Sequence, residues 1–398
     1  MASQKTIEIV KSTAPVLKEH GGEITKVFYK ILLEDHPELK NVFNMTHQKQ
    51  GSQPKVLANA IFQYATYIDK LENLDGAVKT IVQKHVSLSI QPEMYPIVGK
   101  YLLLAIKEVL KDAATDDVIN AWSEAYTDLA NIFISLEEQV YEEVSVAKGG
   151  FRGQEEFIVV KKEKESGFIT SFYLKNVTRE EVPNFRSGQY VAISLSIPGE
   201  EHIHTRNYSL SNCNCKDHLR ISVKKEIGNP DGVVSNYLHE SVQVGDVLKL
   251  GVPAGDFVLQ DSNNPVLLIG GGVGVTPLVS MFHSLVNKTN RDVAFVQCVV
   301  NSEHHAFKGE LINSLKKNVN YLSIYSEPLK SDVLGKDYDV KGFVKSEILE
   351  TYLTPDTEIY FCGPTPFMAE VLKITRELNI KPSKVNYEFF GPAEELNI

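Results

Sequence analysis

The hydrophobic pattern of this 398-residue chain changes abruptly near residue 147. Before that point apolar residues recur every three or four positions, and no stretch alternates with period two. Such spacing is typical of amphipathic helices, and it predicts an all-α domain of about seven helices. Residues 1–147 also contain no arginine and no cysteine, which sets them apart from the remainder. The helical pattern is clearest in the segments 5–17, 23–35, 59–68, 78–90, 95–110 and 118–144.

Beyond the glycine-rich segment 148–153 the pattern becomes that of strands. Short segments at 168–174, 189–195, 206–210, 219–226 and 246–252, separated by Gly, Pro and Asn, predict a small β-barrel. After Asn263 and Asn264, apolar runs alternate with helical segments, which predicts a parallel sheet with helices on both faces. We therefore expect three domains, at residues 1–147, 152–262 and 263–398.

Charge and cysteine content restrict the class of partner. The 51 acidic residues exceed the 41 basic ones, so the net charge is −10, which argues against nucleic acid or an anionic membrane surface as the main partner. No apolar run approaches the ~18 residues of a membrane-spanning helix, and the first residues lack a signal-peptide pattern. Four cysteines are too few for a disulfide scaffold, so a reducing, cytoplasmic location is expected.

Two motifs in the last domain indicate nucleotide binding. The segment Gly270–Pro277 follows an apolar strand and opens a helix, where glycines let the backbone approach a phosphate and the helix N-terminus supplies N–H donors. Cys362, Gly363 and Pro364 follow another apolar strand. Both motifs are therefore expected at the carboxyl edge of the sheet, where open α/β sheets bind ligands. Alone, a glycine-rich turn is weak evidence, because many such turns bind nothing.

The barrel segment has two motifs of its own. Arg206 to Ser209 combines a guanidinium suited to phosphate, an aromatic ring and a hydroxyl within four residues. Gly232 to Asn236 opens a helical stretch that can offer N–H groups to a second phosphate. Taken singly, each is better explained as an ordinary set of strand residues or a turn.

The order of these motifs, with Pro253 to Phe257 and the terminal Glu388 to Pro392, resembles the ferredoxin–NADP⁺ reductase family over roughly residues 155 to 398. The resemblance implies that FAD is bound by Tyr190, Arg206, Asn207, Tyr208 and Ser209, and its pyrophosphate by Gly232 to Ser235. It implies that NAD(P)H is bound by Gly272, Val273, Gly274, Val275, Thr276 and Pro277 together with Cys362, Gly363 and Pro364. The isoalloxazine would be flanked by Phe389, Phe390, Gly391 and Pro392.

In the helical part, His85 lies on an apolar face of the segment 78–90. A lone histidine in such a place is more often a core residue than a metal ligand. Its surroundings are informative, however, because an all-α domain of this length with Tyr29, Phe43, Gln53, Leu57 and Tyr95 at these spacings resembles a globin. The segments 37–45 and 83–99 resemble the flavohemoglobin subgroup, and with the reductase-like part that resemblance covers essentially the whole chain.

This resemblance implies one haem b with His85 as the proximal iron ligand and Phe43 against the haem. Glu137 and Tyr95 would hold the other ring nitrogen of His85, although Glu137 stands among acidic neighbours that indicate a solvated face. Tyr29, assisted by Gln53, would donate a hydrogen bond to bound O₂, and Leu57 would restrict the same space. Lys84 and Glu388 would face each other where the haem and flavin parts meet.

The implied activity is that of a nitric oxide dioxygenase for NO detoxification. Two NO and two O₂ are converted to two nitrate with one NAD(P)H as cosubstrate, and electrons pass from NAD(P)H to one FAD and then to haem. The partners would be these small molecules alone, and the chain a monomer. Two alternatives stay open: a haem-based O₂ sensor or carrier with its own reductase, and a haem-free flavin reductase with a helical docking domain.

Overall fold

The structure, a computed structural model, describes residues 2–43, 52–213, 216–288 and 290–390. The chain folds into two compact units. The first comprises Met1–Val146, Arg152–Gln154 and Ser194–Arg206, and the second comprises Ala147–Phe151, Glu155–Ile193 and Asn207–Ile398. Among the described residues, no helix combines the length and apolarity needed to cross a membrane.

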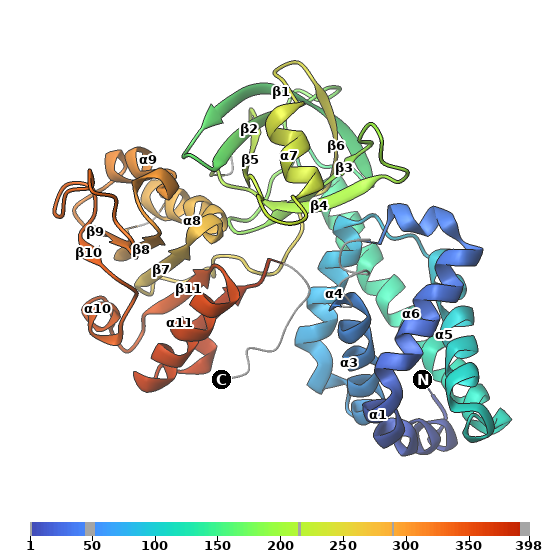
Figure 1. Cartoon of the computed structure of the whole chain (residues 1–398). Coiled ribbons are helices and arrows are strands. Elements are labelled where there is room, and N and C mark those ends of the chain that lie inside the picture. The colour runs from blue at the N-terminus through green and yellow to red at the C-terminus, as the bar shows by residue number, and fades with distance from the viewer. Residues whose placement is uncertain (1, 44–51, 214–215, 289, 391–398) are drawn as a thin grey trace. The chain divides into compact units, whose positions relative to one another are not determined.

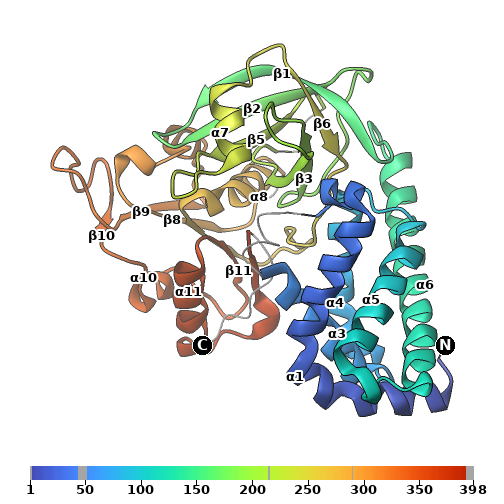
Figure 2. The ribbon, with the colours of Figure 1, turned by 45° about the vertical axis from the view of Figure 1, so that its right-hand side comes forward.

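The first unit is helical, as predicted (Figures 1 and 2). Its described α-helices are α1 (Gln4–Asp35), α3 (Ser52–Tyr67), α4 (Asp75–Ser87), α5 (Met94–Leu110) and α6 (Asp116–Val146). Short 3₁₀ turns connect them: η1 (Pro37–Asn41), η2 (Leu71–Leu74) and η3 (Lys111–Ala113).

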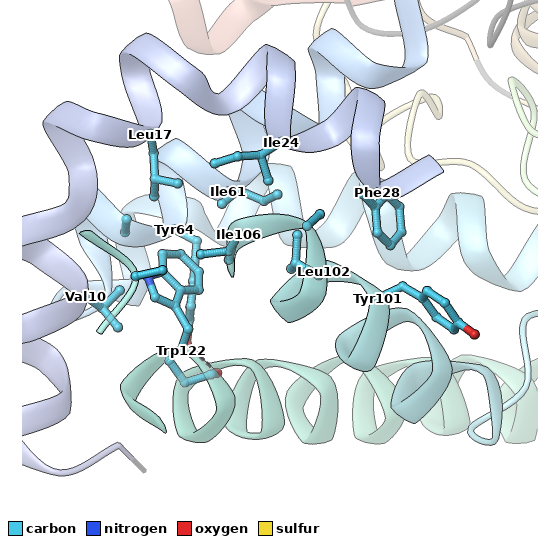
Figure 3. Close-up of a cluster of buried hydrophobic side chains, with 14 of the residues drawn as sticks. Val10, Leu17, Ile24, Phe28, Ile61, Tyr64, Tyr101, Leu102, Ile106 and Trp122 are labelled. Atoms are coloured by element: carbon cyan, nitrogen blue, oxygen red, sulfur yellow. Dashed lines mark hydrogen bonds between the residues drawn. The ribbon is translucent and has the colours of Figure 1, made fainter. Parts of the chain in front are cut away.

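One apolar core joins the helices of this unit. Val10, Leu17, Ile24 and Phe28 form a buried stripe along α1, since their spacings of seven and four residues return to the same helix face. Figure 3 shows this stripe facing side chains of α3, α5 and α6. Each fully buried side chain of this kind contributes roughly 1.5–3 kcal/mol to folding.

Helix α1 differs from the expectation of two separate helices at 5–17 and 23–35. It runs unbroken through Pro15, although proline inside a helix costs about 3 kcal/mol. The buried stripe continues on both sides of Pro15, from Val10 to Leu17 and beyond, so packing against the other helices offsets the local cost.

The FAD-type part of the chain, most of which belongs to the second unit, is built on a six-stranded sheet in the order β4-β3-β6-β1-β2-β5. Its elements are β1 (Gln154–Lys164), β2 (Ile169–Asn176), β3 (Tyr190–Leu195), β4 (His204–Ser209), β5 (Leu219–Lys224), α7 (Val233–Glu240) and β6 (Val247–Gly251). Strand β2 pairs antiparallel with both β1 and β5. A bridge between Leu210 and Ile221 links the two edge strands, because Leu210 directly follows β4. The sheet therefore curls into the predicted barrel.

The rest of the second unit is a parallel six-stranded sheet in the order β10-β9-β8-β7-β11-β12. Its strands are β7 (Val266–Gly271), β8 (Val293–Val299), β9 (Val319–Tyr325), β10 (Val340–Lys341), β11 (Glu358–Cys362) and β12 (Val385–Glu388). Its helices are α8 (Val275–Lys288), α9 (Lys308–Asn313), α10 (Ser346–Glu350) and α11 (Thr365–Glu377), with 3₁₀ turns η4 (Gly272–Gly274), η5 (Ser302–His304) and η6 (Pro382–Lys384).

Helices cover both faces of this sheet, with α8 and α9 on one side and α10 and α11 on the other (Figure 1). Alternate residues of β7 pack on opposite faces of the sheet. Val266 and Leu268 lie in the core that contains α8, and Leu267 and Ile269 lie in the core that contains α11. Strand order reverses between β7 and β11, so the carboxyl ends of these two strands flank the crevice where such sheets bind ligands.

Candidate functional site

His85 on α4 is held by side chains from two other helices. Its Nδ1 lies 2.7 Å from Oε1 of Glu137 on α6 and 3.0 Å from the hydroxyl of Tyr95 on α5. The Tyr95 hydroxyl also donates to Glu137 Oε1. Glu137 is only 2% exposed, so the solvated face suggested by its acidic neighbours is wrong for this residue.

This network determines what the imidazole can do. Hydrogen bonding of Nδ1 to a carboxylate favours the tautomer with the proton on Nδ1, which leaves the Nε2 lone pair for a ligand. Burial, reinforced by the hydrogen bond to Glu137, raises the pKa of Tyr95, so its hydroxyl stays a neutral donor. Within the described ranges no cluster of three or more His, Cys, Asp or Glu could hold a metal ion. Haem takes one protein donor on its proximal side, and a histidine whose Nδ1 is held by a buried carboxylate fits that role.

Three further aromatic residues of α6 belong to this proximal region, and sequence reasoning missed them. Tyr126 donates to the carbonyl of Tyr95 at 2.8 Å, and Tyr141 donates to the carbonyl of Ile90 at 2.9 Å. The ring of Phe133 lies 5.8 Å from that of His85. Spacings of seven, four and four residues, from 126 through 133 and 137 to 141, put all of them on the Glu137 face of the helix, which is the signal that could have found them.

Tyr29 lies on α1, Gln53 and Leu57 lie on α3, and Phe43 follows η1. The Tyr29 ring is buried and meets the Phe43 ring edge-on at 5.4 Å between centroids. Phe43 and Leu57 both pack, partly buried, on the core cluster that contains Tyr29. The side-chain oxygen of Gln53 is buried and has no hydrogen-bond partner among the residues that the structure describes. A buried acceptor of this kind costs about 1–3 kcal/mol unless a ligand or water satisfies it, which fits a polar ligand beside Gln53.

Lys84 and Glu388 fall in different units. Lys84 is an exposed residue of α4, and Glu388 is the half-buried last residue of β12. Their expected pairing stays a prediction.

The residues expected at FAD lie on β3, β4 and α7. Arg206 and Tyr208 project from one face of β4 and Asn207 and Ser209 from the other, by strand alternation. Tyr190 begins β3, and a Cβ at Gly255 would lie 2.9 Å from its ring, so that position, at φ +114°, requires glycine.

Helix α7 begins directly after Gly232, and no side chain caps its first turn there. The Ser235 hydroxyl instead accepts a hydrogen bond from the Glu226 backbone N–H at 3.1 Å. The first N–H groups of α7 are thus suited to a phosphate, as the Gly232 to Ser235 motif predicts.

The two nucleotide motifs lie against each other at the carboxyl ends of β7 and β11. A Cβ at Gly274 would fall 2.3 Å from the carbonyl oxygen of Cys362, so only glycine permits this approach. Gly271 and Gly363 both pack on the ring of Phe367, where a Cβ would fall 2.8 Å and 2.5 Å from ring carbons. The remaining motif residues lie around this contact: Gly272 and Val273 in η4, Val275, Thr276 and Pro277 in the first turn of α8, and Pro364 before α11.

Cys362 and Glu388 are register partners on β11 and β12, which places the thiol and the carboxylate on neighbouring strands. Burial raises the pKa of Cys362 well above its ordinary value, so the thiol is neutral. Phe389 follows, with its ring 5.8 Å from that of Tyr387, and Phe390 is exposed. Gly391 and Pro392 lie outside the described residues.

Comparison with known proteins agrees with this arrangement. Residues 26–133 match the globin family, 156–259 the oxidoreductase FAD-binding domain and 268–373 the oxidoreductase NAD-binding domain. The chain is therefore a globin joined to an NAD(P)H-dependent flavin oxidoreductase.

Its full-length relatives place it more narrowly. It is 50% identical to a flavohemoprotein of Bacillus thuringiensis subsp. konkukian over the whole of both chains, and 45% identical to that of Bacillus subtilis over 100% of this chain and 99% of the other. Among solved structures it matches a flavohemoglobin of Malassezia yamatoensis with bound FAD and heme (27% identity, TM-score 0.86, covering 98% and 99% of the two chains). The chain belongs to the flavohemoprotein family.

Proposed function

We propose that this protein is a nitric oxide dioxygenase that converts NO and O₂ to nitrate at the expense of NAD(P)H. The observation that carries the proposal is the hydrogen-bonded set of His85, Glu137 and Tyr95. A solved FAD- and NAD-binding domain of a nitric oxide dioxygenase from Vibrio cholerae, 32% identical to this chain, supports it (TM-score 0.56, covering 60% of this chain and 99% of that one).

Haem, when bound, supplies an iron that binds O₂ and accepts single electrons, and FAD takes two electrons as hydride and releases them singly. The residues on the proximal side tune this chemistry. A buried carboxylate on Nδ1 makes the imidazole of His85 a stronger donor to a metal, which favours O₂ activation over simple storage. Tyr95 holds Glu137 in place, since its hydroxyl donates to the same carboxylate oxygen.

On the distal side, Tyr29 would donate a hydrogen bond to the O₂-derived ligand, with Gln53 beside it. Phe43 and Leu57, both apolar and partly buried, would narrow the space so that only small ligands such as O₂ and NO enter. A buried hydroxyl aimed at a developing negative charge acts strongly, because the surroundings have a low effective dielectric constant.

In the second unit, the Gly272 to Pro277 turn and Cys362 to Pro364 would hold NAD(P)H, and β4 with the first turn of α7 would hold FAD. The neutral thiol of Cys362 would lie near the reacting nicotinamide without adding a charge there. The net charge of the chain does not steer NO or O₂ toward the site, because both molecules are neutral.

NADH-dependent removal of NO under air tests the proposal. Protein that is replete with haem and FAD, as judged by a Soret band and flavin absorbance, should consume NO only when both NADH and O₂ are present. NO loss no faster than in buffer would show the proposal to be wrong. Tight O₂ binding without NO turnover would instead identify a sensor or carrier, and a missing Soret band would identify a haem-free reductase.

A further inference from the structure

A partly buried ionic cluster joins the FAD-binding and NAD-binding domains within the second unit. Arg220 on β5 donates from Nη1 and Nη2 to the two carboxylate oxygens of Glu310 on α9, at 2.8 and 2.9 Å. His283 on α8 lies 2.5 Å from the same carboxylate, Nε2 to Oε1. One carboxylate from the NAD-binding domain thus receives charged or polar donors from both domains.

The cluster is more enclosed than a surface ion pair, with side-chain exposures of 6% for Arg220, 13% for His283 and 30% for Glu310. The Arg220 guanidinium lies 5.2 Å from the Phe307 ring. Burial raises the pKa of Glu310, but the hydrogen bonds from His283 and Arg220 outweigh it and lower the pKa to about 2, so the carboxylate stays charged. A bidentate arginine–carboxylate pair also sets orientation, because both groups are planar.

Arg220 and His283 each connect the cluster to a motif that is expected to bind a cofactor. On the barrel side, Arg220 donates from Nε to the Ser211 hydroxyl at 3.2 Å and from Nη2 to the Ser211 carbonyl. Ser211 stands two residues after Ser209, the last residue of the motif expected at FAD. On the other side, His283 lies on α8, the helix that begins at Val275 within the nucleotide turn.

A second contact between the two domains involves the segment before β2 and the turn η5. The Gly167 backbone N–H donates to the Glu303 carbonyl at 2.7 Å, and the Phe168 ring stacks on that of His304 at 4.4 Å between centroids. Gly167 precedes β2, and Glu303 and His304 lie in η5 after β8. With two separated contacts, rotation of one domain against the other is restricted about more than one axis.

We propose that Arg220, Glu310 and His283 form a positioning cluster that sets the nucleotide turn at the correct distance from the flavin for hydride transfer. The proposal rests on the use of FAD and NAD(P)H by these domains and does not depend on NO as the substrate. None of the three residues belongs to the motifs expected to contact FAD or NAD(P)H. They act through Ser211 and through α8.

The test separates the two electron-transfer steps in the full-length protein loaded with haem and FAD. Anaerobic stopped-flow mixing with NADH measures flavin reduction, and laser photoreduction of the flavin measures the onward step to haem. Glu310→Gln should slow flavin reduction by at least about tenfold, since a misplacement of about 1 Å can cost about a hundredfold. The flavin-to-haem step, FAD content and Soret band should stay at their wild-type values.

Two further variants keep the test decisive even if Glu310→Gln folds poorly. His283→Leu removes only the link to α8 and should also slow flavin reduction. His283→Gln should restore much of the rate, because the glutamine amide can donate to Glu310 from nearly the position of Nε2.

Glu377→Gln is the matched control. Glu377 is an exposed carboxylate of α11 that pairs with Lys373 at 3.8 Å, and the variant should reduce flavin at the wild-type rate.

Flavin reduction at the wild-type rate in both Glu310→Gln and His283→Leu would overturn the proposal. So would an equal slowing of the flavin-to-haem step, since that result would mean that the cluster supports the FAD-binding domain itself. Neither measurement uses NO, so these outcomes are distinct from a failure of the proposed dioxygenase activity.

Discussion

Neighbouring glutamates of α6 have opposite surroundings. Glu137 is buried against His85, whereas Glu138 is about 40% exposed and forms a bidentate pair with Arg152 at 2.5 and 2.7 Å. Local composition alone cannot distinguish them, because both stand in the same acidic run. The distinction depends on the helix face, since Phe133 and Tyr141 are buried and lie four residues to either side of Glu137.

Replacing His85 tests the proposed iron ligand. His85→Ala should abolish the Soret band and leave flavin absorbance unchanged, because haem loses its one protein donor while the second unit is untouched. The variant also leaves the buried Glu137 carboxylate without the imidazole donor, so a loss of stability of about 1–3 kcal/mol should appear in thermal unfolding.

His20→Ala is the matched control, because His20 lies on the surface. Its side chain is 42% exposed and forms a long pair with Glu23, at 3.9 Å. It should retain haem. A full Soret band in His85→Ala would show that another residue binds the iron.

The hydrophobic periodicity of the sequence predicted well which segments are helices and which are strands. It did not predict that one helix runs through a proline or which strands lie next to each other in a sheet. The helix α1 passes through Pro15 because the apolar stripe, a long-range property, outweighs a local breaker. The sequence also predicted that the Gly270–Pro277 and Cys362–Pro364 motifs share one edge of a sheet. It did not predict that β7 and β11 are adjacent, since strand order depends on packing across the whole domain.

That adjacency makes Gly274 a sensitive position. Gly274→Ala should separate the two turns, because the added Cβ would meet the Cys362 carbonyl at 2.3 Å. We expect flavin reduction by NADH to fall by at least about tenfold and the haem and flavin spectra to persist. The KM for NADH, measured with ferricyanide as acceptor, should rise.

Gly309→Ala is the matched control, since a Cβ added at this position of α9 would meet none of the described atoms within 4 Å. It should behave as the wild type. An unchanged KM and rate in Gly274→Ala would contradict the contact between the two turns.

For the whole molecule, the break near residue 147 corresponds to the end of α6 at Val146. The predicted order of a helical part, a barrel and a parallel sheet is confirmed. The contact between Arg220 and Glu310 was not foreseen, because the two residues are 90 positions apart and each is an ordinary charged residue in its own segment. Pairing of Lys84 with Glu388 stays a prediction of the same kind.

The proposed dioxygenase activity requires that both atoms of O₂ enter the product. Turnover of NO with ¹⁸O₂ and NADH by the haem- and FAD-replete protein, followed by mass spectrometry of the nitrogen oxides, tests this requirement. We expect nitrate that carries two ¹⁸O atoms, with two nitrate formed for each NADH oxidised. Nitrate with one labelled oxygen or none, or nitrous oxide as the main product, would contradict the proposed activity.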